Sequence, residues 1–246
     1  MVKNFKMIIE YDGTDYHGWQ RQKQDRTIQG KIEQAILLMT AKQVRLYASG
    51  RTDAGVHACG QTANFCCETE LTPEAIQKGL NSILPSDIVI QDCRSIHESF
   101  HARYDARSKI YHYKILNRSL PAAIGRQYAL FVRRKLDTAA MRQAITHILG
   151  SHDFKAFEGT GSPRSHTIRN VMAADLTEKA DGRLTFKIEA DGFLRFMVRN
   201  IVGTLLDVGL GKISTEEFKE ILESRDRSRA GATAPSHGLF LMEVKY

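Results

Sequence analysis

The chain has 246 residues and a mass of 27.8 kDa; 42% of its residues are hydrophobic, and its formal charge is +7. That size allows one large domain or two smaller ones, and no apolar run approaches the roughly 18 residues needed to span a bilayer. Because the first residues also lack the apolar core of a signal peptide, we expect a cytoplasmic protein that is not bound to a membrane.

The first hundred residues alternate between strand and helix patterns. A helix is predicted over 28–39, where apolar residues recur at helical spacing. Thr72 followed by Pro73 predicts the start of a second helix, and Pro85 predicts its end. Alternating apolar residues predict strands over 5–11, 44–49, 61–66 and 88–96.

The second half repeats this mixture. Asp137 predicts a helix start and Gly150 the end of the same helix, while Ser214 with Glu217 forms a capping box for a later one. Asp181-Gly182 predicts a hairpin turn. Strands are predicted over 110–116, 167–178, 183–190 and 239–245, and a further helix over 195–208. Such alternation without a Rossmann order predicts an α+β fold with mostly antiparallel sheets.

Several classes of site are absent from the sequence. The four cysteines have no CxxC spacing, so we expect reduced thiols, and no His or Cys cluster has metal-ligand spacing. Gly159-Thr160-Gly161-Ser162 lacks the Lys-Ser/Thr of a phosphate loop and is predicted to be an ordinary loop. We therefore expect neither a metal nor a cofactor.

The positive charge is concentrated in the middle of the chain. Ten basic and two acidic residues lie between His101 and Arg142, a net charge of +8 in 42 residues. A solvated charged face is the usual meaning of such a run. Aromatic rings stand among these cations: Tyr104, Tyr111, Tyr113, Tyr128 and Phe131. Because cations and stacking rings together suit looped RNA, we interpret this segment as an RNA contact surface that includes Arg103, Arg107 and Lys109.

The run at residues 50–58, Gly50-Arg51-Thr52-Asp53-Ala54-Gly55-Val56-His57-Ala58, suggests a site around Asp53. In extended backbone Arg51 projects to the same side as Asp53, where it can hold that carboxylate ionised. Gly50 and Gly55 permit positive φ angles. For an isolated Thr-Asp-Ala-Gly, a simple turn is the competing interpretation.

This run resembles the active-site loop of tRNA pseudouridine synthases of the A type, in which the aspartate is catalytic. Further motifs follow in family order over essentially the full length. They are Tyr11-Asp12-Gly13-Thr14, Gly18-Trp19-Gln20, Phe100-His101-Ala102-Arg103, Lys109-Ile110-Tyr111-His112-Tyr113, Asp153-Phe154 with Phe157, Gly192-Phe193-Leu194, Met197-Val198-Arg199-Asn200-Ile201-Val202-Gly203, and Ala234-Pro235 with Gly238-Leu239.

The resemblance implies two ferredoxin-like (RRM-like) subdomains, 1–105 and 106–246, that share an extended, mainly antiparallel sheet with helices on one side and an active-site cleft between the halves. It implies a homodimer that converts uridine to pseudouridine at positions 38, 39 and 40 in the anticodon stem-loop of tRNA. Asp53 is then the nucleophile.

The resemblance also suggests roles for other residues. It makes Arg199 the ion-pair partner of Asp53 and leaves Arg51 for a phosphate or the flipped nucleotide, although Arg199 could equally be an exposed helix residue. It makes Tyr111 the ring that stacks on the target uracil, with acceptance of the C5 proton as a second candidate role, whereas a tyrosine in an alternating strand is commonly core. His112 stands where the family often has arginine. The fixed charge that this arginine supplies near the site is missing here, which puts its contact in doubt.

Three further side chains are candidates for RNA contacts. His57 would either order the loop or touch RNA. Trp19 and Arg21 lie in a polar segment whose cations have no other evident partner, so we expect phosphate contacts there, with a buried Trp19 as the alternative.

Two other functions compete with the synthase. A non-catalytic RNA-binding protein would share the basic, aromatic middle but would not need Asp53 beside Arg51. A hydrolase of glycosidic bonds shares the first chemical step, but it usually needs a second carboxylate, and none stands out near Asp53.

Overall fold

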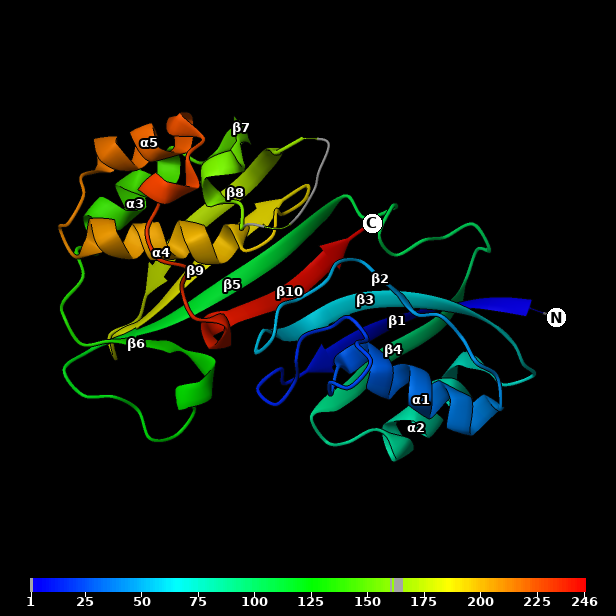
Figure 1. The fold of residues 1–246 in the computed structure, drawn as a ribbon. Coiled ribbons are helices and arrows are strands. Elements are labelled where there is room, and N and C mark those ends of the chain that lie inside the picture. The colour runs from blue at the N-terminus through cyan, green and yellow to red at the C-terminus, as the bar shows by residue number, and fades with distance from the viewer. Residues whose placement is uncertain (1, 160, 162–165) are drawn as a thin grey trace. The chain divides into compact units, whose positions relative to one another are not determined.

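The computed structural model of the protein describes residues 2–159, 161 and 166–246 (Figure 1). These residues form a mixed α+β structure that divides into two compact units. The first unit is Met1–Arg107 with Phe240–Tyr246, and the second is Ser108–Leu239. The sequence placed the last strand, 239–245, with the second subdomain, whereas in the structure all of that strand except Leu239 lies in the first unit. Part of the predicted loop at 159–163 lies outside the described residues.

The first unit is a sheet with two helices. Its strands are β1 (Val2–Tyr11), β2 (Tyr47–Ala48), β3 (His57–Glu68), β4 (Ile88–Ile96) and β10 (Leu239–Lys245), and its helices are α1 (Ile28–Thr40) and α2 (Pro73–Ile83). The sheet order is β4-β1-β3-β10, and β2 pairs with β3. β1 is antiparallel to both β3 and β4, while β10 is parallel to β3.

Local sequence signals explain the helices of this unit. The Thr72 side chain accepts a hydrogen bond from Ala75 N, and Pro73 occupies the first helical position, so the predicted start of α2 is confirmed. The predicted strand 44–49 is wrong in length, since only Tyr47–Ala48 pairs. Just before β2, the Leu46 N–H donates to the Glu33 carboxylate at 3.0 Å instead of to a neighbouring strand.

The second unit has its own sheet and three helices among its described residues. The strands are β5 (Ser108–Asn117), β6 (Leu130–Val132), β7 (Gly150–Asp153), β8 (Ile168–Glu178) and β9 (Arg183–Ala190), and the helices are α3 (Thr138–Thr146), α4 (Met197–Gly209) and α5 (Thr215–Ser224). The order is β5-β9-β8-β7 with antiparallel neighbours, and β6 runs parallel to β5.

Most predicted boundaries of this unit are confirmed. Asp137 accepts from Ala140 N at 2.9 Å, and Ser214 with Glu217 forms both bonds of the capping box. The predicted end of this helix at Gly150 is wrong, because α3 stops at Thr146. The next residues form tighter turns in which each N–H bonds to the carbonyl three residues earlier, and Gly150 begins β7.

Phenylalanine rings hold the helices of the second unit together. Phe157, in the short 3₁₀ helix Phe154–Phe157, lies 5.8 Å from the ring of Phe218 in α5. α4 is buried along most of its length. Over the whole described part of the chain, no helix is long and apolar enough to cross a membrane.

Candidate active site

The backbone around Asp53 is held in one conformation by neighbouring hydrogen bonds. Val56 N donates to Asp53 O at 3.2 Å and closes a turn in which Gly55 has φ +76. Thr52 O accepts from Trp19 N at 3.1 Å, and Gly55 N donates to Tyr16 O at 3.3 Å. The half-buried Asp53 therefore stands on a loop that the segment 12–19 fixes from one side. Of the two flanking glycines, which permit a positive φ, Gly55 adopts one and Gly50 does not.

Two glycines of that segment allow it to touch the Asp53 loop. Gly18 has φ +88, and a Cβ at this position would lie 2.6 Å from Thr52 O. A Cβ at Gly13 would overlap Val56 O. The sequence contained both glycines in its motifs, but no local pattern indicated that they pack against a loop nearly forty residues away.

Buried polar side chains form hydrogen bonds within and beside the Asp53 loop. The hydroxyls of Tyr11 and Thr52 lie 2.8 Å apart, and burial raises the pKa of Tyr11 above its ordinary value. His57 is 1% exposed, and its Nδ1 lies 3.1 Å from Gly13 N and 3.0 Å from Asp12 Oδ1. Of the two roles expected for His57, this position fits ordering of the loop.

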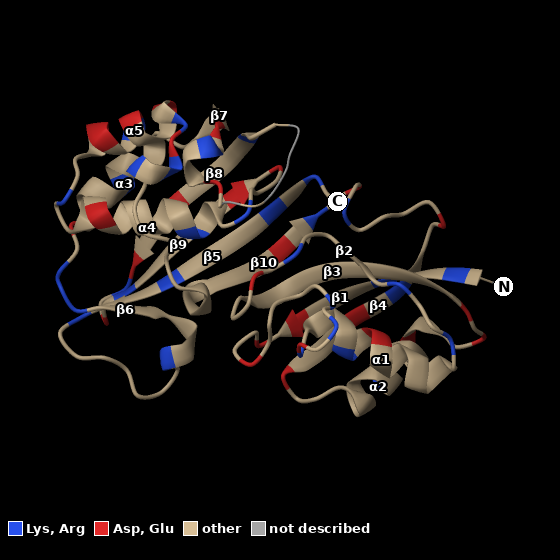
Figure 2. Ribbon diagram, viewed as in Figure 1, with Lys and Arg blue, Asp and Glu red and all other residues tan. Residues whose placement is uncertain are grey.

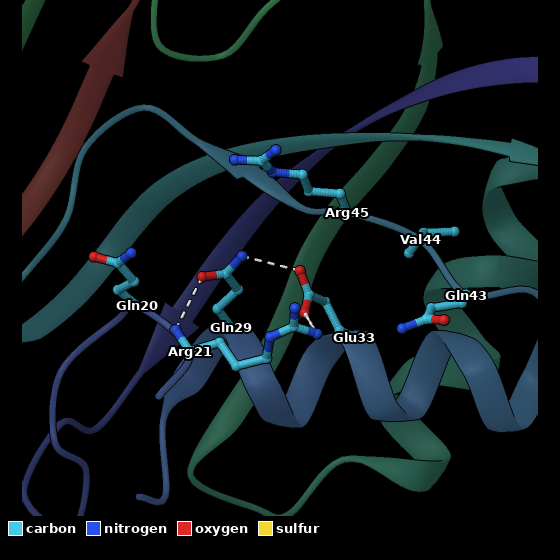
Figure 3. Close-up of a pocket in the computed structure, with 7 residues that line it drawn as sticks. All are labelled: Gln20, Arg21, Gln29, Glu33, Gln43, Val44 and Arg45. Carbon is cyan, nitrogen blue, oxygen red and sulfur yellow. Dashed lines mark hydrogen bonds and ion pairs between the residues drawn. The ribbon is translucent and has the colours of Figure 1, made fainter. Parts of the chain in front are cut away.

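A polar cluster beside α1 involves Arg21 (Figure 3). Glu33 is 7% exposed; its Oε1 accepts from Leu46 N and from the Gln29 amide, and its Oε2 lies 3.0 Å from Arg21 Nη1. The premise that Arg21 has no other partner is therefore wrong. Trp19 is buried, which agrees with the alternative to an RNA contact at this residue.

The same cluster borders a cavity of about 440 Å³. Such a volume is in the range of about 300–1,000 Å³ found for small-ligand sites. Its lining is almost entirely polar or charged: Gln20, Arg21, Gln29, Glu33, Gln43, Val44 and Arg45.

The basic middle of the chain lies largely in solvent. Lys109 is half-buried on β5, whereas Arg103 and Arg107 are exposed. Outside this segment, Arg51 of the Asp53 loop is also exposed. Figure 2 shows basic residues along β5 and on the loop that follows β6. Some of this charge is compensated, because Arg142 lies 3.6 Å from Glu178.

Tyr111 lies on β5 in the second unit. Its ring is buried and meets Phe193 edge-on, with ring centroids 5.0 Å apart. Tyr113, two residues further along the same strand, donates its hydroxyl to Pro235 O at 2.7 Å, and burial raises its pKa. Tyr111 is thus held between strand and loop. Its burial agrees with the interpretation of this tyrosine as a core residue, and the contact with Phe193 orients its ring.

Arg199 lies in the first turn of α4. Its Nε donates to Ala234 O at 2.7 Å, and its own carbonyl accepts from Ala234 N at 3.1 Å. The guanidinium carbon is 4.9 Å from the centre of the Phe196 ring. Arg199 is therefore half-buried and held by the Ala234-Pro235 motif, rather than an exposed helix residue.

Comparison with known proteins agrees with these motifs. The sequence model of the family described as tRNA pseudouridine synthase matches residues 7–105 and 144–246. The chain is 47% identical over 245 residues to a tRNA pseudouridine synthase A of Acetivibrio thermocellus and 46% identical over 246 residues to one of Thermoanaerobacter pseudethanolicus. Each alignment covers 100% of both chains.

A solved structure of an archaeal box H/ACA sRNP Nop10-Cbf5 complex is more distant. Its matching chain is 11% identical, the match covers 82% of this chain and 43% of that one, and the TM-score is 0.36, which is too low to support an argument. The family assignment therefore rests on the sequence matches, which span the chain from end to end. On these matches, the chain belongs to the tRNA pseudouridine synthase family.

Proposed function

We propose that this protein converts uridine to pseudouridine at positions 38, 39 and 40 in the anticodon stem-loop of tRNA, with Asp53 as the nucleophile. The observation that carries the proposal is the loop at 50–58, where Asp53 stands on a backbone held by Trp19, Tyr16 and Val56. The full-length similarity to enzymes named tRNA pseudouridine synthase A supports the same substrate class.

The chemistry requires no redox partner. The bond between ribose C1′ and uracil N1 breaks, the base turns over, and C1′ joins C5; C5 loses a proton and N1 gains one, so the product is an isomer. A carboxylate such as Asp53 supplies the nucleophile, and a fixed backbone keeps it aimed at the nucleoside. Hydrogen bonds between the Asp53 loop and the segment 12–19 reduce the motion of Asp53, which would otherwise lower the rate of attack on the nucleoside.

Two residues of the second unit are proposed to act on the same uridine. Arg199 pairs with Asp53 and keeps that carboxylate ionised, because a neighbouring cation lowers a carboxyl pKa by about 1–3 units. Tyr111 stacks on the uracil, and base–aromatic stacking contributes about 1–3 kcal/mol. Arg51 contacts a phosphate or the flipped nucleotide. The motif matches support these roles.

The larger arrangement is also a proposal. The two units act as ferredoxin-like subdomains of one sheet, and the protein works in the cytoplasm as a homodimer that tRNA crosses. Exposed Arg103 and Arg107, with Lys109, contact the RNA backbone. Binding should then weaken with salt, with a slope of about 0.9 per phosphate neutralised on duplex RNA, and a flat response would contradict this role.

The decisive test follows release of tritium from C5 of uracil in unmodified tRNA. Wild-type protein should release the label and yield pseudouridine in the anticodon arm, and Asp53→Ala should release none while it still binds tRNA. Release of uracil as a free base would favour a hydrolase instead. Binding of tRNA without any tritium release by the wild type would leave an RNA-binding protein.

Tyr111→Phe separates two roles of this ring. Loss of turnover with normal tRNA binding would assign the hydroxyl a part in proton transfer from C5. Full turnover would leave stacking as its role, and Tyr111→Ala should then weaken tRNA binding.

A further inference from the structure

Five side chains of the first unit form a stack on its surface, which we call the Arg-aromatic stack. The rings of Tyr47 and His101 have centroids 5.0 Å apart and are tilted by 50°, and those of His101 and Tyr104 are 4.3 Å apart and tilted by 36°. At the two ends, the guanidinium carbon of Arg45 lies 5.2 Å from the Tyr47 centroid, and that of Arg103 lies 5.7 Å from the Tyr104 centroid. A guanidinium therefore lies near the ring at each end of this row of three rings.

The stack joins two segments that are distant in sequence. Tyr47 belongs to β2, which pairs with β3, and Arg45 precedes that strand. His101, Arg103 and Tyr104 lie in the turn that follows β4. The first segment contributes two of the five side chains and the second contributes three, so the tertiary fold creates this surface.

Hydrogen bonds fix the turn that carries the exposed end. Within it, Tyr104 N donates to His101 O at 3.1 Å, and Arg103 N donates to His101 Nδ1 at the same distance. Between them, the fully buried Ala102 donates its N–H to Asn64 Oδ1 at 2.9 Å and accepts from the Tyr246 hydroxyl at 2.7 Å. The backbone that carries these rings is therefore held before a ligand binds, which lowers the ordering cost of binding.

The outermost ring is unusually open to solvent. The side chain of Tyr104 is 74% exposed although its backbone is anchored. Cations flank the rings, and an apolar protein partner would gain little from such a surface. Nucleobases stack on aromatic side chains and on guanidinium planes, and arginines beside them can meet phosphates.

The polar cavity adjoins this stack through Arg45. Arg45 lines the cavity, as Figure 3 shows, and its guanidinium is also one end of the Arg-aromatic stack. The amides of Gln20 and Gln43 line the same cavity, together with Arg21, which is paired with Glu33. Guanidinium and amide groups are those that bind phosphates and base edges, so the chemistry next to the stack also suits RNA.

We propose that the Arg-aromatic stack is a second nucleotide-binding site: an unpaired base of tRNA stacks on Tyr104, and Arg103 and Arg45 contact the flanking phosphates. This inference rests on the proposed tRNA substrate and adds a site that takes no part in bond breaking. The stack holds the RNA in register while another nucleotide is presented to Asp53.

The test compares three variants for binding to an unmodified tRNA transcript. Tyr104→Ala should raise the dissociation constant about 5- to 150-fold, which corresponds to stacking of one base. Tyr104→Phe keeps the ring and should bind within about twofold of the wild type. Leu38→Ala, which removes an apolar side chain that is 69% exposed on α1, is the matched control and should bind normally.

Salt dependence separates stacking from charge. Arg103→Ala should reduce the slope of log affinity against log salt by about 0.7–0.9, whereas Tyr104→Ala should leave the slope unchanged. Lys219→Ala removes an exposed charge of α5 and should change neither value.

Several results would overturn the stack as a site. Normal binding by Tyr104→Ala would do so, and so would an equal loss in Tyr104→Phe, since stacking does not need the hydroxyl. Tritium release by the wild type, measured on the same tRNA, separates this failure from that of the proposed function. An active wild type with no effect at Tyr104 refutes the stack alone.

Discussion

Replacing Gly18 by alanine should displace the Asp53 loop and lower turnover. With φ +88, an alanine here costs about 1–2 kcal/mol in backbone strain. Its Cβ would also lie 2.6 Å from Thr52 O, where ordinary contacts begin at 3.4 Å, so the two segments must separate by about 0.8 Å. The total loss of stability should be about 2–3 kcal/mol.

The larger effect should fall on the chemistry. Thr52 precedes Asp53, and the Trp19 N–H bond to Thr52 O, now 3.1 Å, must lengthen when the segments separate. Because a misplacement of about 1 Å can cost about 100-fold in rate, we expect kcat to fall about 10- to 100-fold. Tritium release at saturating tRNA measures the rate, and denaturant unfolding measures the stability.

Gly211→Ala is the matched control for backbone strain. Gly211 follows α4 with φ +67, and a Cβ there would meet nothing within 4 Å. This variant should lose about 1 kcal/mol of stability and keep its kcat. Wild-type kcat in Gly18→Ala, or an equal fall in both variants, would refute the argument that contact with the loop positions Asp53.

Three further outcomes are expected. Tyr16→Phe removes a hydroxyl that donates to Asp87 at 2.6 Å and accepts from Arg26 at 2.9 Å, so the free energy of unfolding should fall by about 1–3 kcal/mol, whereas Tyr104→Phe should change it by less than about 0.5 kcal/mol in the same titration. Arg199→Met should abolish tritium release with tRNA binding mostly kept, and near-normal turnover would remove Arg199 from the mechanism. Burial, and to a smaller extent the positive charges of Lys187 and Lys114, lower the pKa of His112 below its ordinary value of 6.5. The unfolded chain therefore binds this proton at a higher pH than the folded chain does. The free energy of unfolding should then fall as the pH drops below about 6.5. His112→Gln should weaken that dependence, and an unchanged pH profile would show that other groups cause it.

Local signals in the sequence were sufficient for most helices and strands. Thr72 with Pro73, Asp137, and Ser214 with Glu217 begin helices in the structure as predicted, because a cap needs only a side-chain oxygen and an N–H two or three residues away. The end of α3 was missed. Gly150 suits a helix end by residue type, but α3 ends at Thr146 and Gly150 begins β7.

Surface charge was the weaker signal. Arg21 was predicted to be available for RNA, yet it pairs with the buried Glu33 on the next helix. The burial of Trp19 and His57 likewise depends on neighbours from other parts of the chain. Residue type alone does not show which charges are compensated, since the partner lies across a fold that the local pattern does not describe.

By itself, the sequence determined the periodic elements, their caps, the basic and aromatic middle, and the run around Asp53, since each depends on residues near one another along the chain. The tertiary structure alone decided that β10 joins the first unit, that Gly13 and Gly18 press against the Asp53 loop, and that the ring of Tyr47 contacts that of His101. These contacts join residues tens of positions apart. Their energy comes from close packing and shared hydrogen bonds, and it arises only when folding brings the two segments together.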